Sequence, residues 1–557
     1  MAHYYSLLLP RKRRFSSNRF ALLWRTCVAR LALTAALVCG GPAVAAPGEL
    51  DNTFATICPL AVCSGGRLFH AVGSGGAAGI YAVAVQPDNK ILVAGTCKHT
   101  LTTGVHDGLA HERFCVQRYR PPLITSGNWL DTPILGFGGF GENLSGTAIV
   151  AMRQNENAKL NSVRILPDGK ILLAGTCDFS VLSTYQFCVT RLLPNGAQDP
   201  DFATGLAGPD NAALTTMLVQ GDGRIVLVGE CSDAGLSHFC LARLLPDGQP
   251  DRDFGVNGVV LSTTAFQRNP SGAVLRADGS IVVAGTCDDL GRKFCVRSYK
   301  PDGSMDTSFG PQNFPVNTRT LHIGVGTTTD TASGGIAQTA SGKLIISGSC
   351  IDTPTAANVF LFCTVRVNAN GTLDSSFGTN GYQYDRMGIS HSYPTATAVQ
   401  PDGKIVVSGV CDNGNEDFCA IRYHSEGTID NSFSLFPVVP GLTGHLTQKA
   451  PARANAMALQ PDGNVLIAGT CTDAGQSKFC TVRLQGGPYG YKQCTMDIDG
   501  DGQVLGTTDA ILHARVAAGL SGNAVLNGLT FAPSAQRTSW PAIRDFLGYH
   551  CGMRVKS

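Results

Sequence analysis

Charge is scarce in this sequence. Charged residues occupy 15% of its 557 positions, whereas ordinary soluble domains contain roughly 25%. The chain is therefore poor in the Glu, Lys and Arg that long surface helices and coiled coils need. Positive charge is not in excess either, because removing the seven Lys and Arg of residues 1–46 leaves 36 basic against 41 acidic residues. Nucleic acids require clustered positive charge, so we expect no nucleic-acid partner.

Long hydrophobic runs are missing as well. No stretch reaches the ~20 apolar residues that span a bilayer, so we expect no transmembrane segment. The apolar run at 31–38 follows a basic stretch and precedes the small residues Ala43 and Ala45, an order typical of a secretory signal that is cleaved near this point. Residues 1–46 are therefore predicted to direct export to the periplasm, the cell surface or the medium. Arg13 and Arg14 suggest a twin-arginine signal and Cys39 a lipoprotein signal, but both fit less well.

Familiar catalytic signatures are also lacking. The sequence contains no nucleophile elbow, phosphate-binding loop or zincin helix, and its twelve histidines do not recur at a fixed spacing. An enzyme is therefore the less favoured interpretation.

What the sequence does contain is one unit repeated seven times. A turn and an apolar run end in cysteine, as in PDGKILLAGTC at Cys177 and PDGKIVVSGVC at Cys411, and a Phe-Cys pair follows. A third phrase, G-x-x-D-x-x-F, comes after most of these pairs, for example from Gly427 to Phe433. Repeats of this length indicate one supersecondary unit each, and each unit offers four short strands separated by tight turns.

The second strand of each unit is apolar at successive positions, such as Ile405, Val406 and Val407. A strand reads this way when both of its faces are covered, and radially packed four-stranded blades provide such cover. The first residues after the signal, 48–54, form a fourth-strand phrase without a unit, whereas the seventh unit has no such phrase. We therefore predict an all-β, seven-bladed propeller over residues 47–487, closed by pairing of 48–54 with the strand at 479–484.

The repeated units resemble delta-60 repeats over roughly residues 48–485. The resemblance implies a propeller on an exported bacterial protein, and it brings no catalytic residues with it. This sequence differs from the generic pattern because it adds a cysteine pair to every unit.

The cysteines indicate disulfides. Two of the twenty, Cys27 and Cys39, lie in the signal, and an even number remains in an exported chain. Pairing within each unit joins neighbouring strands of a hairpin, where the Cα distance suits a disulfide. The predicted pairs are Cys97–Cys115, Cys177–Cys188, Cys231–Cys240, Cys287–Cys295, Cys350–Cys363, Cys411–Cys419 and Cys471–Cys480, with Cys58–Cys63 and Cys494–Cys551 from the remaining residues.

Loop lengths separate the two ends of the predicted propeller. The turn between the first and second strands is constant, whereas the distance between the paired cysteines varies from 8 residues (287 to 295) to 18 (97 to 115). We expect all length variation to fall on one face, either as a ligand-binding surface or through drift. Six acids follow the first cysteine on that face, and they either start turns or surround the channel mouth and bind a cation: Asp178, Asp233, Asp288, Asp352, Asp412 and Asp473.

The repeats stop after Cys480, and residues 488–557 have a helical pattern. Before the first predicted helix stand Asp497, Asp499 and Asp501 at alternate positions, with Gly502 in sixth place. This is the start of a calcium loop, with the carbonyl of Gln503 and the carboxylate of Asp509 as further expected ligands. The segment resembles half of a dockerin, which implies a cohesin partner. It differs in placing Asp509 at position 13 and in lacking a second loop.

Three functions remain open. The first is a non-catalytic exported binding or scaffold protein whose variable face takes a glycan, a protein or a cationic ligand and whose C-terminal module binds Ca²⁺. The second is a secreted glycan hydrolase or lyase with carboxylates at the propeller channel, for which two carboxylates ~5–9.5 Å apart would be the sign. In the third, the propeller is a spacer and the C-terminal module makes the contact.

Overall fold

The computed structural model describes residues 47–547 apart from gaps, and the predicted signal at 1–46 lies outside the described residues. The gaps are residues 48, 52–53, 55–65, 75, 101–107, 121–129, 133–138, 142–143, 154–155, 180–183, 234, 263–266, 289–291, 311–320, 325–329, 333, 352–358, 434–441, 444–445, 450, 462, 487–496, 502, 536 and 546. Within the described part of the chain, no helix is both long enough and apolar enough to cross a membrane.

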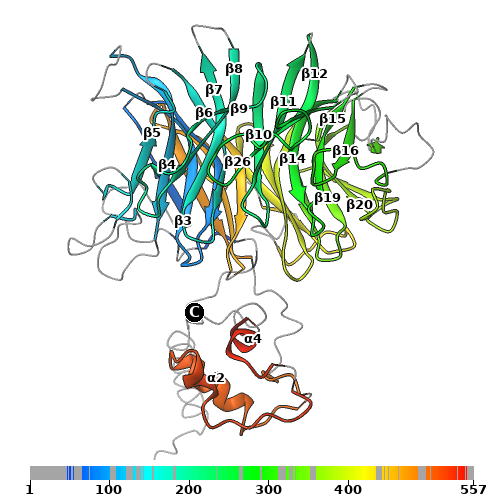
Figure 1. Cartoon of the computed structure of the whole chain (residues 1–557). Helices are drawn as coiled ribbons and strands as arrows, with labels where there is room; N and C mark the ends of the chain where they lie inside the picture. The colour runs from blue at the N-terminus through cyan, green and yellow to red at the C-terminus, as the bar shows by residue number, and fades with distance from the viewer. Residues whose placement is uncertain are drawn as a thin grey trace, which may run out of the picture. The chain divides into compact units, whose positions relative to one another are not determined.

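Seven antiparallel sheets of four strands each form the blades of a propeller (Figure 1). Blades 1 to 3 contain β2 (Ala78–Val85), β3 (Ile91–His99), β4 (His111–Tyr119) and β5 (Thr147–Val150); β6 (Ala158–Ile165), β7 (Ile171–Phe179), β8 (Thr184–Leu192) and β9 (Gly205–Ala207); and β10 (Ala212–Val219), β11 (Ile225–Asp233), β12 (Leu236–Leu244) and β13 (Val259–Leu261).

Blades 4 to 7 complete the series. They contain β14 (Gln267–Leu275), β15 (Ile281–Cys287), β16 (Lys293–Tyr299) and β17 (Leu321–Ile323); β18 (Ile336–Gln338), β19 (Leu344–Cys350), β20 (Leu361–Val367) and β21 (Tyr382–Asp385); β22 (Ser392–Val399), β23 (Ile405–Asp412), β24 (Glu416–Tyr423) and β25 (Leu442–Thr443); and β26 (Ala452–Leu459), β27 (Val465–Asp473), β28 (Gln476–Leu484) and β1 (Arg67–His70).

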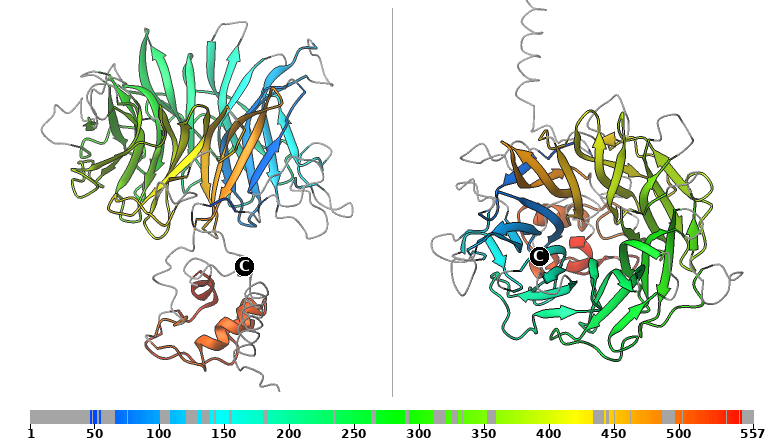
Figure 2. Two further views of the ribbon diagram at one scale, coloured as in Figure 1. Left: turned by 180° about the vertical axis from the view of Figure 1, so that it is seen from behind. Right: turned by 90° about the horizontal axis from the view of Figure 1, so that it is seen from above.

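The first strand of each blade is innermost. These seven strands contact one another in succession around the ring, and β26 contacts β2 to close it, as the view along the axis shows (Figure 2). The second strand of each blade is covered on both faces by the neighbouring blades. Ile405, Val406 and Val407 of β23 are accordingly all buried. The unbroken apolar run in the sequence is thus explained by cover on both faces.

The N-terminal segment completes the seventh blade, as predicted. β1 pairs with β28, with Arg67 opposite Val482 and His70 opposite Phe479. However, the outer strand is β1 and not residues 48–54, because Leu50 makes only a single bridge to Leu484. The expected strand at 48–54 is therefore wrong in detail, although closure by the N-terminal chain is correct.

The same correction applies to the G-x-x-D-x-x-F phrase in every blade where it occurs. In blade 2 the phrase makes one bridge, Leu192 to Gln198, and the fourth strand, β9, begins only after it. Asp199 accepts a hydrogen bond from the backbone N–H of Asp201 at 3.1 Å. An aspartate that binds the N–H two residues ahead starts a turn, so the phrase is a turn before the strand.

This turn carries a repeated ion pair that we call the clasp. An Arg of the third strand donates its Nε–H to the Asp of the phrase, as in Arg191–Asp199 at 2.7 Å and Arg422–Asp430 at 2.8 Å. The guanidinium lies over the Phe of the same phrase, with Arg422 4.6 Å from the ring centre of Phe433. Six blades share the ion pair and the ring contact, although Arg483 pairs with Asp51 through a terminal nitrogen and the ring in blade 1 is Phe140. The arginines are Arg118, Arg191, Arg243, Arg366, Arg422 and Arg483.

The clasp also joins neighbouring blades. The NH1 group of Arg191 donates to the carbonyl of Pro246, 55 residues away in blade 3, at 2.8 Å. Arg243 reaches Pro301 and Arg422 reaches Gly486 in the same way. In blades 1, 2, 3, 5 and 6 the guanidinium therefore binds a carboxylate of its own blade and a backbone carbonyl of the next blade, which fixes the spacing between these blades.

Blade 4 builds the clasp differently. Ser298 takes the place of the third-strand arginine, and Arg276, from the turn after β14, lies 5.8 Å from the ring centre of Phe309. Arg276 also donates to the carbonyl of Ala369 in blade 5. An arginine from the first turn of the blade thus supplies the same link to the next blade.

We expect the clasp carboxylates to control acid stability. Burial opposes the ionisation of Asp199, but hydrogen bonds from Lys170, the N–H of Asp201 and Arg191 outweigh it and lower the pKa of Asp199 to about 2. Because this pKa lies below the ordinary value near 3.9, its stabilising effect is complete above pH ~4 and is lost as the pH falls toward 2. Urea unfolding should therefore show constant stability from pH 7 to 5 and a steep loss between pH 4 and 2.

A matched pair of variants checks the origin of this loss. Asp430→Asn should lower stability at pH 7 and make the acid loss shallower, because the pKa of Asp430 is also lowered, against its burial, by Ser432, Arg422 and Lys404. Asp178→Asn, at an exposed position, should change neither. An unchanged acid profile in Asp430→Asn would mean that other groups govern it.

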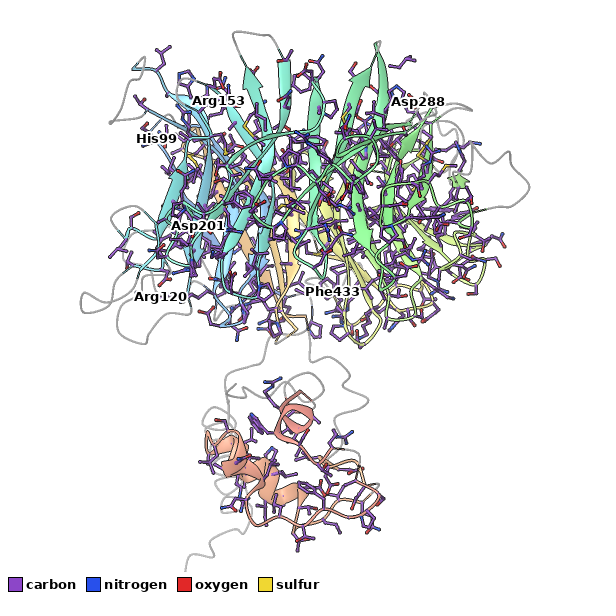
Figure 3. The ribbon with its side chains drawn as sticks, viewed as in Figure 1. His99, Arg120, Arg153, Asp201, Asp288 and Phe433 are labelled. Atoms are coloured by element: carbon purple, nitrogen blue, oxygen red, sulfur yellow. A yellow bond between two sulfur atoms is a disulfide. The ribbon has the colours of Figure 1, made fainter. Side chains whose placement is uncertain are left out.

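The two ends of the propeller can now be defined. The turn face carries the clasps and the turns between first and second strands. A residue of the turn can bind the clasp, as Lys170 binds Asp199 at 2.9 Å. The hairpin face carries the hairpins between second and third strands together with the connections between blades. Figure 3 shows His99, Arg153 and Asp288 toward one end and Arg120 and Phe433 toward the other.

The expectation that all length variation falls on one face is wrong. Hairpin lengths do vary on the hairpin face, since the cysteine separation runs from 8 to 18 residues. The turn face varies too, because β9 begins six residues after Asp199 whereas β17 begins fifteen residues after Asp306. The prediction took the G-x-x-D-x-x-F phrase as the fourth strand. Residues inserted between this phrase and the true fourth strand were therefore assigned to the hairpin face, whereas they lie on the turn face.

All seven predicted intra-blade disulfides are present, with Cα distances of 5.8–5.9 Å. Each disulfide joins cysteines that are diagonal neighbours on adjacent strands and not directly opposed residues. In blade 1, Cys97 lies opposite Arg113 and Cys115 lies opposite Gly95. The glycine is required because a Cβ on Gly95 would lie 1.9 Å from the carbonyl oxygen of Gly79 in the first strand. The repeated Gly-x-Cys sequence is thereby explained. Cys58, Cys63, Cys494 and Cys551 lie outside the described residues.

The C-terminal region contains three short helices, α2 (Asp509–Ala517), α3 (Asn523–Leu526) and α4 (Trp540–Asp545). They share a small core of their own, whose buried residues are Ile498, Leu512, Val516, Val525, Ile543 and Leu547. The predicted helical character of this region is confirmed, at a modest helix length.

Candidate functional site

The six acids predicted around the channel mouth have individual roles. Asp412 accepts a hydrogen bond from the N–H of Gly414 at 2.9 Å and starts a turn. Asp473 binds Lys449 at 2.8 Å and Lys478 at 2.7 Å, and these two lysines lower its pKa to about 2. Asp288 lies 3.7 Å from Arg292.

The remaining three of the six acids show no shared site either. Asp178 is exposed, while the side chain of Asp233 and all of Asp352 lie outside the described residues. Among the residues that the structure describes, no three of the six form a group that could hold a metal ion. The geometry thus favours turn formation and ion pairing over a shared carboxylate ring.

Side-chain pairs link neighbouring blades on the hairpin face. One member lies three residues before the second cysteine of a blade, and the other lies on the innermost strand of the next blade. Glu112 meets Lys159 at 3.8 Å between blades 1 and 2. Glu416 binds Arg453 through two hydrogen bonds of 2.7 and 2.5 Å between blades 6 and 7.

The same position between blades 5 and 6 is aromatic. Phe360 takes the place of the acid and Tyr393 that of the base, with ring centres 5.7 Å apart. His391 packs against both rings, 5.3 Å from Phe360 and 6.1 Å from Tyr393. The sequence analysis missed this group because Phe360 lies more than 30 residues before His391 and Tyr393, and only their fixed offsets from Cys363 and Cys411 connect them.

A cavity of about 90 Å³ opens on the same face between blade 2 and the connection that leads to it from blade 1. Its lining includes Met152, Arg153, Glu156 and Thr204. The Oε2 atom of Glu156 is buried there without a hydrogen-bond partner. This space is large enough to hold water.

The second candidate site is the acidic loop of the C-terminal region. Carboxylate oxygens of Asp497, Asp499 and Asp501 all lie within 4.8 Å of one another. Asp499 is fully buried, and its Oδ2 atom has no hydrogen-bond partner. Burial and the neighbouring carboxylates, Asp509 first among them, raise the pKa of Asp499.

The backbone holds these three carboxylates in place. Asp497 Oδ1 accepts hydrogen bonds from the N–H groups of Gly500 and Asp501, at 2.7 and 3.0 Å. Asp501 Oδ1 accepts one from the N–H of Gln503 at 2.8 Å. Arg537 donates to the carbonyls of Ile498 and Asp497, at 2.8 and 2.9 Å, and so fastens the outer side of the loop.

Asp509, the expected closing ligand, is not brought into the group of three. Its Oδ1 atom accepts hydrogen bonds from the N–H groups of Ile498 and Asp499, at 2.6 and 3.1 Å, and its Oδ2 atom accepts one from Leu505 at 2.8 Å. The carboxylate therefore connects the loop to the start of α2. The extra residue before Asp509, which moves it from position 12 to 13, accounts for this shift.

Comparisons with known proteins agree with the architecture. Residues 166–202, 220–254, 276–309, 339–377 and 400–433 match the model of a β-propeller domain of unknown function, DUF5122. These stretches run from the first turn to the clasp in blades 2 to 6. No curated protein sequence matches the chain.

The solved structures that align with this chain include several enzymes. The polysaccharide lyase Uly1 is 9% identical, with a TM-score of 0.41, over 75% of this chain and 92% of the lyase. A PL25 ulvan lyase is 12% identical, with a TM-score of 0.38, over 75% and 96%. The aldose sugar dehydrogenase of Streptomyces coelicolor is 12% identical, with a TM-score of 0.34, over 58% and 93%.

The architecture of the chain itself identifies its fold. Its seven blades close through the N-terminal strand, and the family match follows the same repeat boundaries. The chain is a β-propeller repeat protein.

Proposed function

We propose that this protein is an exported binding protein, in which the propeller presents a ligand site on its hairpin face and the C-terminal region binds Ca²⁺. Seven disulfides favour an oxidising compartment. A framework of clasps and disulfides holds hairpins of different length, and binding groups commonly lie on such loops. The ligand class is an extracellular glycan or protein.

The buried, unpaired Oδ2 atom of Asp499 is the observation that carries the calcium proposal. An unpartnered carboxylate oxygen is costly to bury, and two further carboxylates face it within 4.8 Å. A hard cation that takes oxygen ligands would satisfy all three. Asp497, Asp499 and Asp501 would supply side-chain oxygens and Gln503 its carbonyl, while Asp509 would orient the loop from behind.

Calorimetry on the mature full-length chain tests the calcium site. We expect one binding event with a dissociation constant on the order of 10⁻⁴ M, as in extracellular calcium modules, and weaker binding of magnesium. Calcium at 100 times this constant should stabilise the C-terminal region by about 2.7 kcal/mol. Hydrogen exchange should slow in α2 and remain unchanged in the propeller strands.

Two variants complete this experiment. Asp501→Ala should weaken calcium binding at least tenfold, because it removes one of three ligands from a partly exposed position. Asp178→Ala, an exposed acid on the propeller, should leave binding unchanged. Calcium binding that survives in Asp501→Ala, or the absence of any calcium heat, would show that the loop is an ordinary acidic turn.

The alternative function is a secreted glycan hydrolase or lyase that uses carboxylates at the propeller channel. Release of reducing ends, or of unsaturated products that absorb ultraviolet light, would identify it. A cohesin partner for the C-terminal region remains a prediction from the dockerin resemblance. Binding without turnover would support the non-catalytic proposal.

A further inference from the structure

The aromatic group between blades 5 and 6 is held rigidly. The N–H of Phe360 donates to Nδ1 of His391 at 3.2 Å, and the N–H of Ser392 donates to the carbonyl of Phe360 at 3.0 Å. An accepting Nδ1 places the proton of a neutral imidazole on Nε2. Phe360 and His391 are therefore held together before any ligand arrives, which reduces the entropy lost on binding.

The aromatic group is partly open to solvent. Phe360, His391 and Tyr393 are each only partly buried, although large apolar rings are normally covered in a blade interface. Their neighbours are polar: burial and the charges of Glu416 and Asp412 raise the pKa of Tyr393, while Arg453 opposes that rise. An apolar surface thus lies beside a carboxylate and a guanidinium.

We propose that this surface, formed by Phe360, His391 and Tyr393 and flanked by the Glu416–Arg453 pair, binds a pyranose unit of a glycan. This inference rests on the proposed binding function and assigns its site and ligand class. One face of a pyranose ring presents C–H groups that pack on an aromatic ring, and its hydroxyl groups need donors and acceptors at the edge. Binding sites commonly combine an apolar aromatic surface with a few orienting polar groups in this way.

The ring geometry favours a sugar over an organic cation. An aromatic cage surrounds a cation with separated ring faces, whereas these rings pack on one another with centres 5.3–6.1 Å apart. No space for a ligand remains between them. The rings therefore act as a platform for a flat ligand, and the 63% exposed side chain of Arg453 stands beside it.

Affinity electrophoresis and calorimetry on the mature full-length chain test this inference. The probes are a neutral β-glucan, xylan, galactomannan, alginate and polygalacturonate. We expect at least one to bind, with Tyr393→Ala and Phe360→Ala each weakening binding at least tenfold and Tyr393→Phe within about threefold of the wild type. Tyr185→Ala is the matched control and should leave binding unchanged, because Tyr185 takes the position of Phe360 in blade 2 but the next blade has Ala213 at the position of Tyr393.

The outcomes separate this inference from the broader proposal. If the wild type binds a glycan and Tyr393→Ala binds equally well, or if Tyr185→Ala is weakened to the same extent, the site is elsewhere and the binding function stands. If the wild type binds none of the five polysaccharides, both the platform and the glycan ligand are rejected. Near-ultraviolet circular dichroism and thermal unfolding of each variant ensure that a loss of binding reflects the surface.

Discussion

Deleting residues 47–70 is expected to abolish the stability of the propeller almost entirely. This N-terminal segment buries Leu50, Phe54, Leu68 and Phe69, and complete burial of one such side chain contributes about 1.5–3 kcal/mol. Together these contributions are comparable to the entire net stability of a typical protein, about 5–15 kcal/mol. The deletion also exposes the edge of β28, and an exposed edge strand promotes aggregation.

Urea unfolding and size-exclusion chromatography of the exported chain measure this effect. A graded version is the double variant Phe54→Ala, Leu68→Ala, which should remove about 3–6 kcal/mol or more once cavities are included. Val256→Ala, at a side chain that is 77% exposed, is the control and should change stability by less than about 0.5 kcal/mol. A deletion variant that unfolds at the wild-type urea concentration would contradict closure of the ring by this segment.

Replacing a clasp arginine should have the next largest effect. In Arg422→Ala, Asp430 keeps Lys404 at 3.0 Å but loses its buried partner, and the carbonyl of Gly486 loses its donor. Breaking a buried ion pair by removing one partner typically costs about 3–5 kcal/mol. Equilibrium unfolding should show a loss of this size. Additivity with Asp430→Asn would argue against a direct interaction, since coupled pairs are non-additive.

The different clasp of blade 4 allows a rescue experiment. Arg276→Gln should destabilise the protein, because it removes the cation that lies over Phe309 and reaches Ala369. Adding Ser298→Arg should restore stability, because it rebuilds the arrangement found in the other six blades. Ser298→Arg alone, with Arg276 retained, should not stabilise, since two guanidinium groups would compete for Asp306.

Much of this architecture can be predicted from the sequence, because residues required by the blade structure recur at the same position in every repeat. Second strands are apolar at successive positions, first turns have Gly or Asn where φ is positive, as at Asn89 with φ 63°, and paired cysteines keep a fixed place in the hairpin. Seven copies of such a unit determine the blade number and the seven disulfides. The fourth strands could not be located in the same way, because β25 spans only Leu442–Thr443 and carries no pattern of its own.

The sequence by itself also determined the three carboxylates of the C-terminal loop, since a spacing of two residues puts side chains on one side of a tight loop. Only the tertiary structure decided that Asp509 binds backbone N–H groups, because one additional residue changes where the helix begins. Only the tertiary structure decided, too, that Phe360 meets Tyr393 and that Arg191 reaches Pro246. Such contacts depend on how neighbouring blades stack, a geometry that is set by the whole ring and that no single repeat encodes.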